Sequence, residues 1–222
     1  MNGQDFTFAG QPLTALPSGA LWWGGRGVLT VSDLHLGKSE RIARRTGAML
    51  PPYETRDTLT RLETDIARTG AKTIICLGDS FDDLAAAESL GEEDQLTLAR
   101  LQAGRRWIWI EGNHDPGPVE FGGTHLSALH EPPLTFRHIA EPAPQAEISG
   151  HYHPKVRMLA RGRSITRPAF LFDAHRLIMP AYGTYTGGLY ADHPALQALM
   201  GPGAKAILIG KAAHLIPLPR VA

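Results

Sequence analysis

Two patterns of apolar and polar positions alternate along the first half of the chain. Short runs of β-branched and aromatic residues have the length of buried strands, and between them apolar residues recur at the spacing of one α-helix face. We expect strands at 28–32, 73–77 and 107–110 and helices at 39–46, 53–69 and 84–103. Gly70 is a suitable C-terminal stop for the second helix, and the third is expected to break near Gly91. This alternation predicts a parallel sheet with right-handed crossovers.

The second half of the chain has a different pattern, in which short apolar runs are separated by proline, glycine and charged turn residues. This spacing predicts a largely antiparallel sheet. The expected strands are 126–129, 134–138, 146–149, 155–159, 170–172 and 176–179, followed by a terminal hairpin of 204–209 and 214–217. Because no repeat and no linker-like segment divides the chain, we expect a single domain over residues 1–222.

Composition excludes some classes of protein. The chain has 222 residues, of which 43% are hydrophobic and 20% are charged, as in soluble globular proteins. Its formal net charge is zero, whereas a protein that wraps long nucleic acid is usually basic; a local basic patch is still compatible with this balance. Cys76 is the only cysteine, so no intrachain disulfide can form. Since the chain has neither a signal-peptide pattern at its start nor an apolar run near the roughly 20 residues that span a bilayer, we expect a cytoplasmic protein without membrane contact.

Polar clusters follow the expected strands. They are Asp33-x-His35, Gly78-Asp79, Gly112-Asn113-His114-Asp115 and, in the second half, Gly150-His151-Tyr152-His153. In an open parallel sheet the ligand site lies beyond the carboxyl ends of the strands, so we expect these clusters to converge. A single aspartate at a strand end is more often a turn or cap residue, but four clusters in this order favour one shared site.

The residue types in these clusters are those that bind a pair of divalent metal ions. Carboxylate, imidazole and amide oxygen suit manganese, iron, zinc or cobalt, and the lack of thiolate argues against a structural zinc site. Asp33 and His35 are two residues apart, so both side chains can point the same way from an extended segment. The same holds for His151 and His153. Asp79 is well placed to bridge two ions with its two oxygens.

The set D-x-H, G-D, G-N-H-[DE], H and G-H-x-H resembles the motifs of the calcineurin-like metallophosphoesterase superfamily over about residues 28–153. Within it, the chain resembles the ligase-associated DNA damage response endonuclease family, PdeM. The stretches that carry this finer resemblance are SDLHLGK (32–38), LGDSFDD (77–83), LTFRH (134–138), SGHYHP (149–154) and MPAYGTYTGGLY (179–190). The resemblance implies an α/β fold, the αββα sandwich: two mixed β-sheets flanked by helices, with a dimetal site at the carboxyl ends of the strands.

The resemblance also implies a role for each polar residue. The ligands expected for one ion are Asp33, His35, Asp79 and His153, and those expected for the other are Asp79, Asn113, His138 and His151. His114 would lie beside the phosphate, with Asp115 orienting its ring, and both are expected to be catalytic. Two divalent ions, manganese first among the candidates, would activate a bridging hydroxide to attack phosphorus.

One ligand position has two candidates. His138 ends the strand-like LTFRH and matches an Arg-His pair of the subfamily. His130 precedes Glu131-Pro132-Pro133, which is typical of a turn. We therefore expect His138 to be the ligand and keep His130 as the alternative.

The resemblance implies a phosphodiesterase or endonuclease that acts on DNA in repair, beside a DNA ligase and a helicase. The same metal core serves pyrophosphatases and phosphomonoesterases of small nucleotides, which form the alternative. A non-catalytic partner-binding protein is a third hypothesis, disfavoured because all the expected ligands are present. Arg41, Arg44 and Arg45 share one face of an expected helix, which is either a solvated face or a contact for a nucleic-acid backbone.

Overall fold

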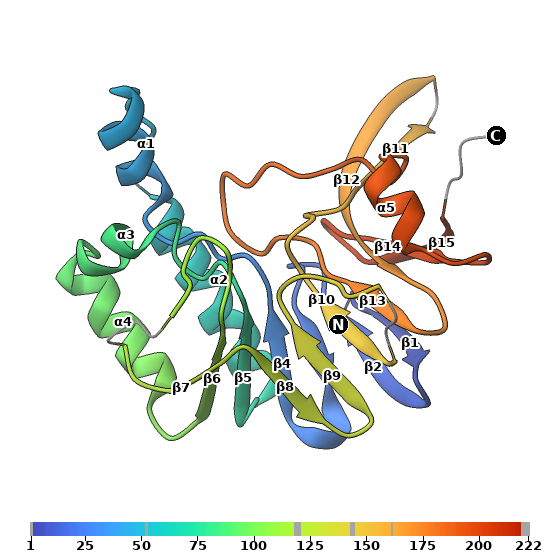
Figure 1. Ribbon diagram of the computed structural model, residues 1–222, viewed down its shortest axis with the longest axis horizontal. Coiled ribbons are helices and arrows are strands. Elements are labelled where there is room, and N and C mark those ends of the chain that lie inside the picture. Colours follow the sequence, from blue (N-terminus) through green and yellow to red (C-terminus); the bar gives the residue numbers. More distant parts are fainter. Residues whose placement is uncertain (1, 52, 118–120, 143–144, 161, 219–222) are drawn as a thin grey trace.

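Two mixed β-sheets stack against each other in the computed structural model, and helices cover their outer faces (Figure 1). The structure describes residues 2–51, 53–117, 121–142, 145–160 and 162–218. The helices are α1 (Lys38–Thr46), α2 (Glu54–Thr69), α3 (Leu84–Glu88), α4 (Glu92–Gln102), α5 (Pro194–Leu199) and the short 3-10 helix η1 (Gly24–Arg26). This architecture is the αββα sandwich that the resemblance implies.

The first sheet has the strand order β1 to β7. Its strands are β1 (Gln4–Phe8), β2 (Gln11–Ala15), β3 (Leu21–Trp23), β4 (Val28–Val31), β5 (Thr73–Leu77), β6 (Arg106–Ile110) and β7 (Thr124–Leu126). Strands β4 to β7 are parallel, which confirms the expected parallel sheet. Strands β1 to β3 extend it by antiparallel pairing and are additional to the expected elements. Each of them spans only three to five residues and has two apolar residues on its inward face, so the period-two signal is too short to identify a strand.

The second sheet has the order β15-β14-β12-β13-β10-β9-β8, and β11 pairs with β12. Its strands are β8 (Ala128–Glu131), β9 (Leu134–Arg137), β10 (Glu147–Ser149), β11 (Lys155–Ala160), β12 (Arg163–Phe172), β13 (Arg176–Ile178), β14 (Lys205–Leu208) and β15 (His214–Pro217). The outer pairs are antiparallel, including the expected terminal hairpin β14–β15. At the centre, β10 is parallel to both β9 and β13. Apolar periodicity shows which strand face is buried but not which way the strand runs, so these parallel pairs were not predicted.

Alternate residues of the buried strands face two apolar layers. In β5, Ile75 and Leu77 face the second sheet, whereas Ile74 and Cys76 belong to the layer under helices α2 and α4. A third layer packs α5 through Leu196 against the outer face of the second sheet. These side chains are almost fully buried, and burial of apolar area, at roughly 25 cal/mol per Å², is the main force holding the layers together.

The polar loops of both sheets meet at one edge of the sandwich. Loops that follow β4, β5 and β6 of the first sheet contact loops that follow β9 and β10 of the second. In Figure 1, α1 and the β11–β12 hairpin both project upward from this side of the molecule. Within the described ranges, none of the helices has the length and apolar content needed to cross a bilayer.

Candidate dimetal site

The backbone is unusual at five of the expected ligands. Positive φ angles occur at Asp33 (54°), His35 (47°), Asp79 (47°), His151 (70°) and His153 (46°). For residues other than glycine this conformation is uncommon, and it persists where the surrounding structure holds it in place. One such restraint joins two loops, because the backbone N–H of His35 donates to the carbonyl of Asp79 at 2.9 Å. The loops therefore hold these side chains in a fixed arrangement.

Gly78 allows the closest approach between the two sheets at this edge. Its φ is +76°, and a Cβ atom there would lie 2.3 Å from Nδ1 of His138, so only glycine fits. Nδ1 of His138 lies 3.1 Å from the carbonyl oxygen of Leu77. Because a carbonyl can only accept, Nδ1–H donates to it, and Nε2 is left to face the site.

The first group of candidate ligands is Asp33, His35 and His153, whose donor atoms all lie within 4.8 Å of one another. Nε2 of His153 is 3.0 Å from Oδ1 of Asp33. The Asp33 carboxylate also accepts from the hydroxyl of Ser32 at 2.5 Å and from the backbone N–H of His151 at 3.0 Å. Burial raises the pKa of Asp33, but His153, His138 and Ser32 outweigh burial, so the pKa is lowered.

The second group is Asp79, His138 and His151, with donor atoms again within 4.8 Å of one another. Nε2 of His138 lies 3.3 Å from Oδ2 of Asp79, 3.0 Å from Oδ1 of Asn113 and 3.3 Å from Nδ1 of His151. Oδ2 of Asp79 is also 4.0 Å from Nε2 of His35. Asp79 therefore lies between the two groups, in the position of a bridging ligand.

Charge in this second group is concentrated on Asp79 and His138. Burial opposes ionisation of Asp79, but the hydrogen bond and charge of His138 outweigh it and lower the pKa of Asp79 to about 2. Burial likewise lowers the pKa of His138, but Asp79 and Asp33 outweigh it, so the net shift is upward. Burial and the neighbouring charge of His138 lower the pKa of His151. A proton on Nε2 of His138 thus stabilises the lone pairs of Asp79, Asn113 and His151 that point toward it, and a cation bound between these groups would do the same.

The donor set fits a pair of divalent ions. Oxygen and imidazole donors of this kind suit divalent transition metals. The ring of His35 is only 3% exposed; its Nδ1 lies 2.8 Å from Oδ1 of Asp82, whereas its Nε2 makes no hydrogen bond to the described residues. A buried imidazole nitrogen without such a bond is costly unless another partner satisfies it, and a metal ion at Nε2 would do so.

His114 and Asp115 lie next to the second group but have different surroundings. The backbone N–H of His114 donates to Oδ1 of Asp79 at 2.9 Å, and its ring Nδ1 lies 2.9 Å from the carbonyl oxygen of Asp82. The Asp115 carboxylate instead accepts the backbone N–H groups of Ser80, Phe81 and Gly112, at 2.8, 3.1 and 3.1 Å.

The expected contact between Asp115 and the His114 ring is therefore wrong. The carbonyl of Asp82 takes that place, while Asp115 ties the loop after β5 to the loop after β6. Burial and the charge of Asp79 raise the pKa of Asp115 to about 6, against the three N–H donors. Asp115 therefore holds the two loops together.

Asp82 is a site residue that the sequence analysis missed. It is fully buried, and its Oδ1 lies 2.8 Å from Nδ1 of His35. It follows Asp79 by three residues within the LGDSFDD stretch, where only Asp79 was assigned a role. Arg41 approaches Oδ2 of Asp82 at 2.7 Å and Lys38 approaches Oδ1 at 3.5 Å. Burial raises the pKa of Asp82, and His35, Arg41 and Lys38 outweigh it, so the pKa is lowered. A carboxylate behind an imidazole ligand fixes the ring and increases its basicity.

The basic face of α1 is paired with acidic side chains. Arg41 contacts Asp82, and Arg44 donates to Oδ1 of Asp83 at 2.8 Å. Arg45 lies 3.9 Å from Oδ2 of Asp83. These contacts favour the solvated, ion-paired face over a surface reserved for a nucleic-acid backbone.

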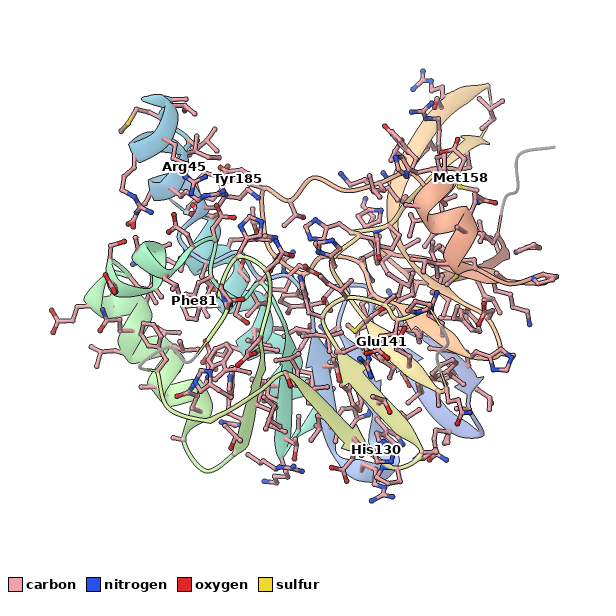
Figure 2. The ribbon with its side chains drawn as sticks, in the orientation of Figure 1. Arg45, Phe81, His130, Glu141, Met158 and Tyr185 are labelled. Atoms are coloured by element: carbon pink, nitrogen blue, oxygen red, sulfur yellow. The ribbon has the colours of Figure 1, made fainter. Side chains whose placement is uncertain are left out.

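The two histidine candidates lie at opposite ends of a hairpin. His138 follows the end of β9 and is 4% exposed within the second group. His130 is exposed on β8, where its Nδ1 lies 3.0 Å from the hydroxyl of Thr135. Figure 2 shows His130 at the bottom of the molecule, near the turn between β8 and β9. The geometry thus favours His138 as the candidate ligand.

Comparison with known proteins adds two findings. A family model described as calcineurin-like phosphoesterase matches residues 27–205. The chain is also similar to the crystal structure of Pseudomonas putida nuclease MPE, with 25% sequence identity and a TM-score of 0.73, and the match covers 97% of this chain and 100% of that chain. No curated protein sequence matches the chain.

Proposed function

The chain belongs to the calcineurin-like phosphoesterase family and is a metal-dependent phosphoester hydrolase; we propose that it is a phosphodiesterase and nuclease that cleaves DNA in repair. The observation that carries the proposal is the pair of ligand groups that meet at Asp79. The similar solved structure is that of a nuclease, which supports a phosphodiester substrate. Action beside a DNA ligase and a helicase, and a cytoplasmic location, stay predictions.

We assign one ion to Asp33, His35, Asp79 and His153, and the other to Asp79, Asn113, His138 and His151. Manganese is the expected metal, with iron, zinc and cobalt as alternatives of the same ligand preference. When bound, the pair supplies Lewis acidity, which activates water and stabilises negative charge on the phosphoryl group. The fixed loops hold the ligands close to their bound arrangement in advance, which reduces the reorganisation that binding requires.

His114 is the proposed catalytic residue of the chain itself. Its Nδ1–H is committed to the carbonyl of Asp82 at 2.9 Å, so Nε2 is the nitrogen left for the substrate. A protonated Nε2 can donate to the leaving oxygen or stabilise charge on the phosphate. Asp115 is proposed as a positioning residue, because its carboxylate holds the N–H groups of Ser80, Phe81 and Gly112.

The direct test compares substrate classes on the purified, manganese-loaded protein. The substrates are bis(p-nitrophenyl) phosphate, p-nitrophenyl phosphate, nucleoside di- and triphosphates, and single- and double-stranded DNA. We expect hydrolysis of the diester and of DNA, and the loss of both in Asp79→Asn with the fold retained. Asp192→Asn changes an exposed aspartate and serves as the matched control. Hydrolysis of monoesters or nucleotides alone would contradict the proposal and favour a phosphomonoesterase or pyrophosphatase.

A further inference from the structure

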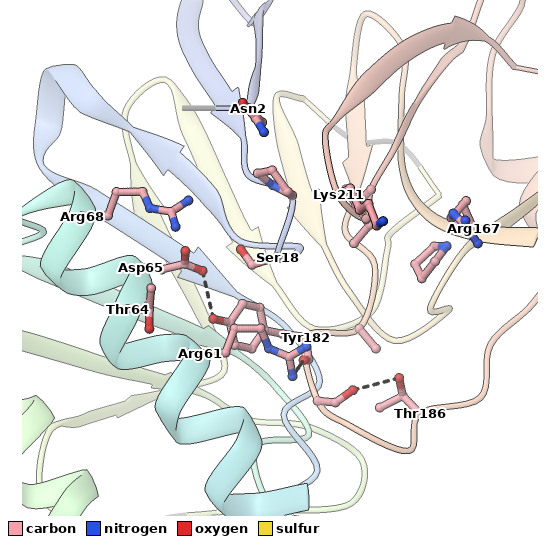
Figure 3. A pocket seen from close by; sticks show the side chains of 16 residues that line it. Asn2, Ser18, Arg61, Thr64, Asp65, Arg68, Arg167, Tyr182, Thr186 and Lys211 are labelled. Atoms are coloured by element: carbon pink, nitrogen blue, oxygen red, sulfur yellow. Dashed lines mark hydrogen bonds between the residues drawn. The ribbon is translucent and has the colours of Figure 1, made fainter.

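A hollow of about 770 Å³ lies between α2 and the C-terminal strands, outside the two ligand groups. Figure 3 shows Arg61 and Arg68 on the α2 side, and Arg167 and Lys211 on the other side, with Ser18 between them. Four of its sixteen lining residues are cationic and one, Asp65, is acidic. A chain with zero net charge thus gathers positive charge at this place.

The acidic residue of the hollow, Asp65, is buried and already accepts a hydrogen bond. Asp65 is 2% exposed and accepts the hydroxyl of Tyr182 at 2.9 Å. Arg61 is also partly used, because it donates to the carbonyl of Tyr182 at 2.8 Å and lies 3.6 Å from Asp57. The surplus positive charge of the hollow therefore comes from its other cations.

Three exposed cations supply this surplus: Arg68, Arg167 and Lys211. Within the described part of the chain, none of them is in an ion pair with an acidic side chain. This differs from the α1 face, where Arg41, Arg44 and Arg45 each lie near Asp82 or Asp83. Three unneutralised cations from separate segments, turned toward one hollow, favour an anionic ligand.

A second hollow of about 250 Å³ lies beside the first and reaches one residue of the candidate metal site. It is lined by His153, Lys155, Thr166, Pro168, Ala181, Thr186 and Gly187. Pro168, Ala181 and Thr186 also line the first hollow, so the two adjoin. Lys155 adds a further cation, and His153 is one of the proposed ligands. The positive surface therefore begins beside the metal site and extends to Lys211.

We propose that the adjoining hollows bind the phosphate backbone of a DNA strand, at nucleotides next to the bond cleaved at the metal site. This inference rests on the proposed function, since it assumes that the scissile phosphate lies at the ligand groups. Phosphates are matched by arginine and lysine side chains, and each such contact adds salt-dependent affinity without reading sequence. A small diester occupies the metal site alone and does not reach Arg68 or Lys211.

The test uses the double variant Arg68→Ala/Lys211→Ala, which removes one cation from each side of the hollow. Lys72→Ala is the matched control, because Lys72 is exposed and precedes β5, at the opposite end of that strand from the site. Binding of a fluorescent single-stranded oligonucleotide of about 20 nucleotides is measured by anisotropy on the protein in EDTA, over a series of salt concentrations. Each lost phosphate contact is expected to reduce the slope of log affinity against log salt by about one, with roughly tenfold weaker binding at low salt for the pair.

Kinetics on the manganese-loaded protein give the second readout. The double variant is expected to lose about tenfold in kcat/KM on the oligonucleotide, in line with its weaker binding, and to stay within about twofold of the wild type on bis(p-nitrophenyl) phosphate and on a dinucleotide. The Lys72→Ala control is expected to match the wild type throughout. A wild-type salt slope retained by the double variant, an equal loss in the control, or an equal loss on the small diester would each overturn the inference.

Failure of the proposed function gives a different result. A wild-type protein that hydrolyses neither the diester nor DNA contradicts the nuclease proposal, whatever the oligonucleotide binding shows. Binding that depends on Arg68 and Lys211 in EDTA would still support the hollow as a site for a nucleic-acid backbone. A wild-type protein that cleaves the small diester but binds no oligonucleotide would contradict DNA binding in the hollow, while the proposed hydrolysis at the metal site would still be supported.

Discussion

Oδ2 of Asp79 lies 3.3 Å from Nε2 of His138, and this contact joins the two sheets of the sandwich. Asp79 follows β5 of the first sheet and His138 follows β9 of the second. The second ligand group therefore exists only when the apolar faces of the two sheets are packed together. Apolar burial positions the chemistry here, because residues from strands far apart in the sequence share one buried contact.

We predict that replacing each of the two histidine candidates by glutamine, one at a time, separates their roles. His138→Gln is expected to lower the bound manganese from two ions per chain and to reduce diester hydrolysis by at least about 100-fold, since the proposed ligand is lost outright and loss of outer-shell partners alone removes about 10–100-fold. His130→Gln changes an exposed residue and is expected to stay within about twofold of the wild type. Metal content and bis(p-nitrophenyl) phosphate hydrolysis measure both. The reverse ranking would transfer the ligand role to His130.

Loss of the carboxylate behind His35 is expected to weaken metal binding without removing a ligand. In Asp82→Asn the manganese concentration for half-maximal activity is expected to rise about 10–100-fold, because the neutral amide no longer places beside Nδ1 of His35 the negative charge that makes the ring a stronger ligand. Activity at saturating manganese is expected to recover. Asp83→Asn is the neighbouring control, since Asp83 pairs with Arg44 and caps α3. Equal shifts in both variants would show a general effect of the α1–α3 region and not a role for His35.

His114→Gln is expected to affect substrates according to their leaving groups. A proton donor matters most for the alkoxide that leaves from DNA, and general acid catalysis contributes about 10²–10⁴-fold. The p-nitrophenolate of the model diester leaves without a proton, so its hydrolysis is expected to fall much less. Bound manganese is expected to stay at the wild-type amount, because His114 is not among the proposed ligands. Equal losses on both substrates, with metal retained, would contradict proton donation.

Metal affinity is expected to increase with pH. The pKa of His138 is raised by Asp79 and Asp33 against the effect of burial, so the metal-free protein holds a proton there that an ion must displace. The protonated contact stabilises the metal-free fold fully below the unfolded pKa of histidine, and this contribution is lost as pH rises through the raised folded value. Manganese affinity is therefore expected to be weaker at about pH 6 than at about pH 8, with proton release on binding.

Calorimetry in two buffers of different ionisation enthalpy measures that proton release directly. His138→Gln serves as the comparison, since it has no titrating ring at this position. Manganese affinity that stays constant between about pH 6 and about pH 8 would contradict the displacement of a proton from His138.

Local sequence was sufficient to predict the parallel half of the fold and the candidate ligands. The strands that precede Asp33 and Asp79 are continuous apolar runs, and the polar residues follow them directly. The antiparallel strands β1 to β3 were missed because they span only three to five residues, with two inward apolar residues each. The parallel pairs around β10 were missed because pattern does not give strand direction.

Roles that depend on contacts between loops could not be predicted from the sequence. Asp82 was overlooked because its partner, His35, belongs to a different loop. The expected contact of Asp115 was wrong for the same reason, since its neighbour in sequence, His114, turns its ring toward the carbonyl of Asp82 instead. The cationic hollow is assembled from α2, β12 and the turn before β15, so its charge has no counterpart in any single stretch of sequence.

The central claim is that two metal ions share Asp79, and anomalous diffraction from crystals of the manganese-loaded protein tests it most directly. Two anomalous peaks are expected. One should lie among Asp33, His35, Asp79 and His153, and the other among Asp79, Asn113, His138 and His151. A single peak, or a pair of peaks that Asp79 does not join, would contradict the claim.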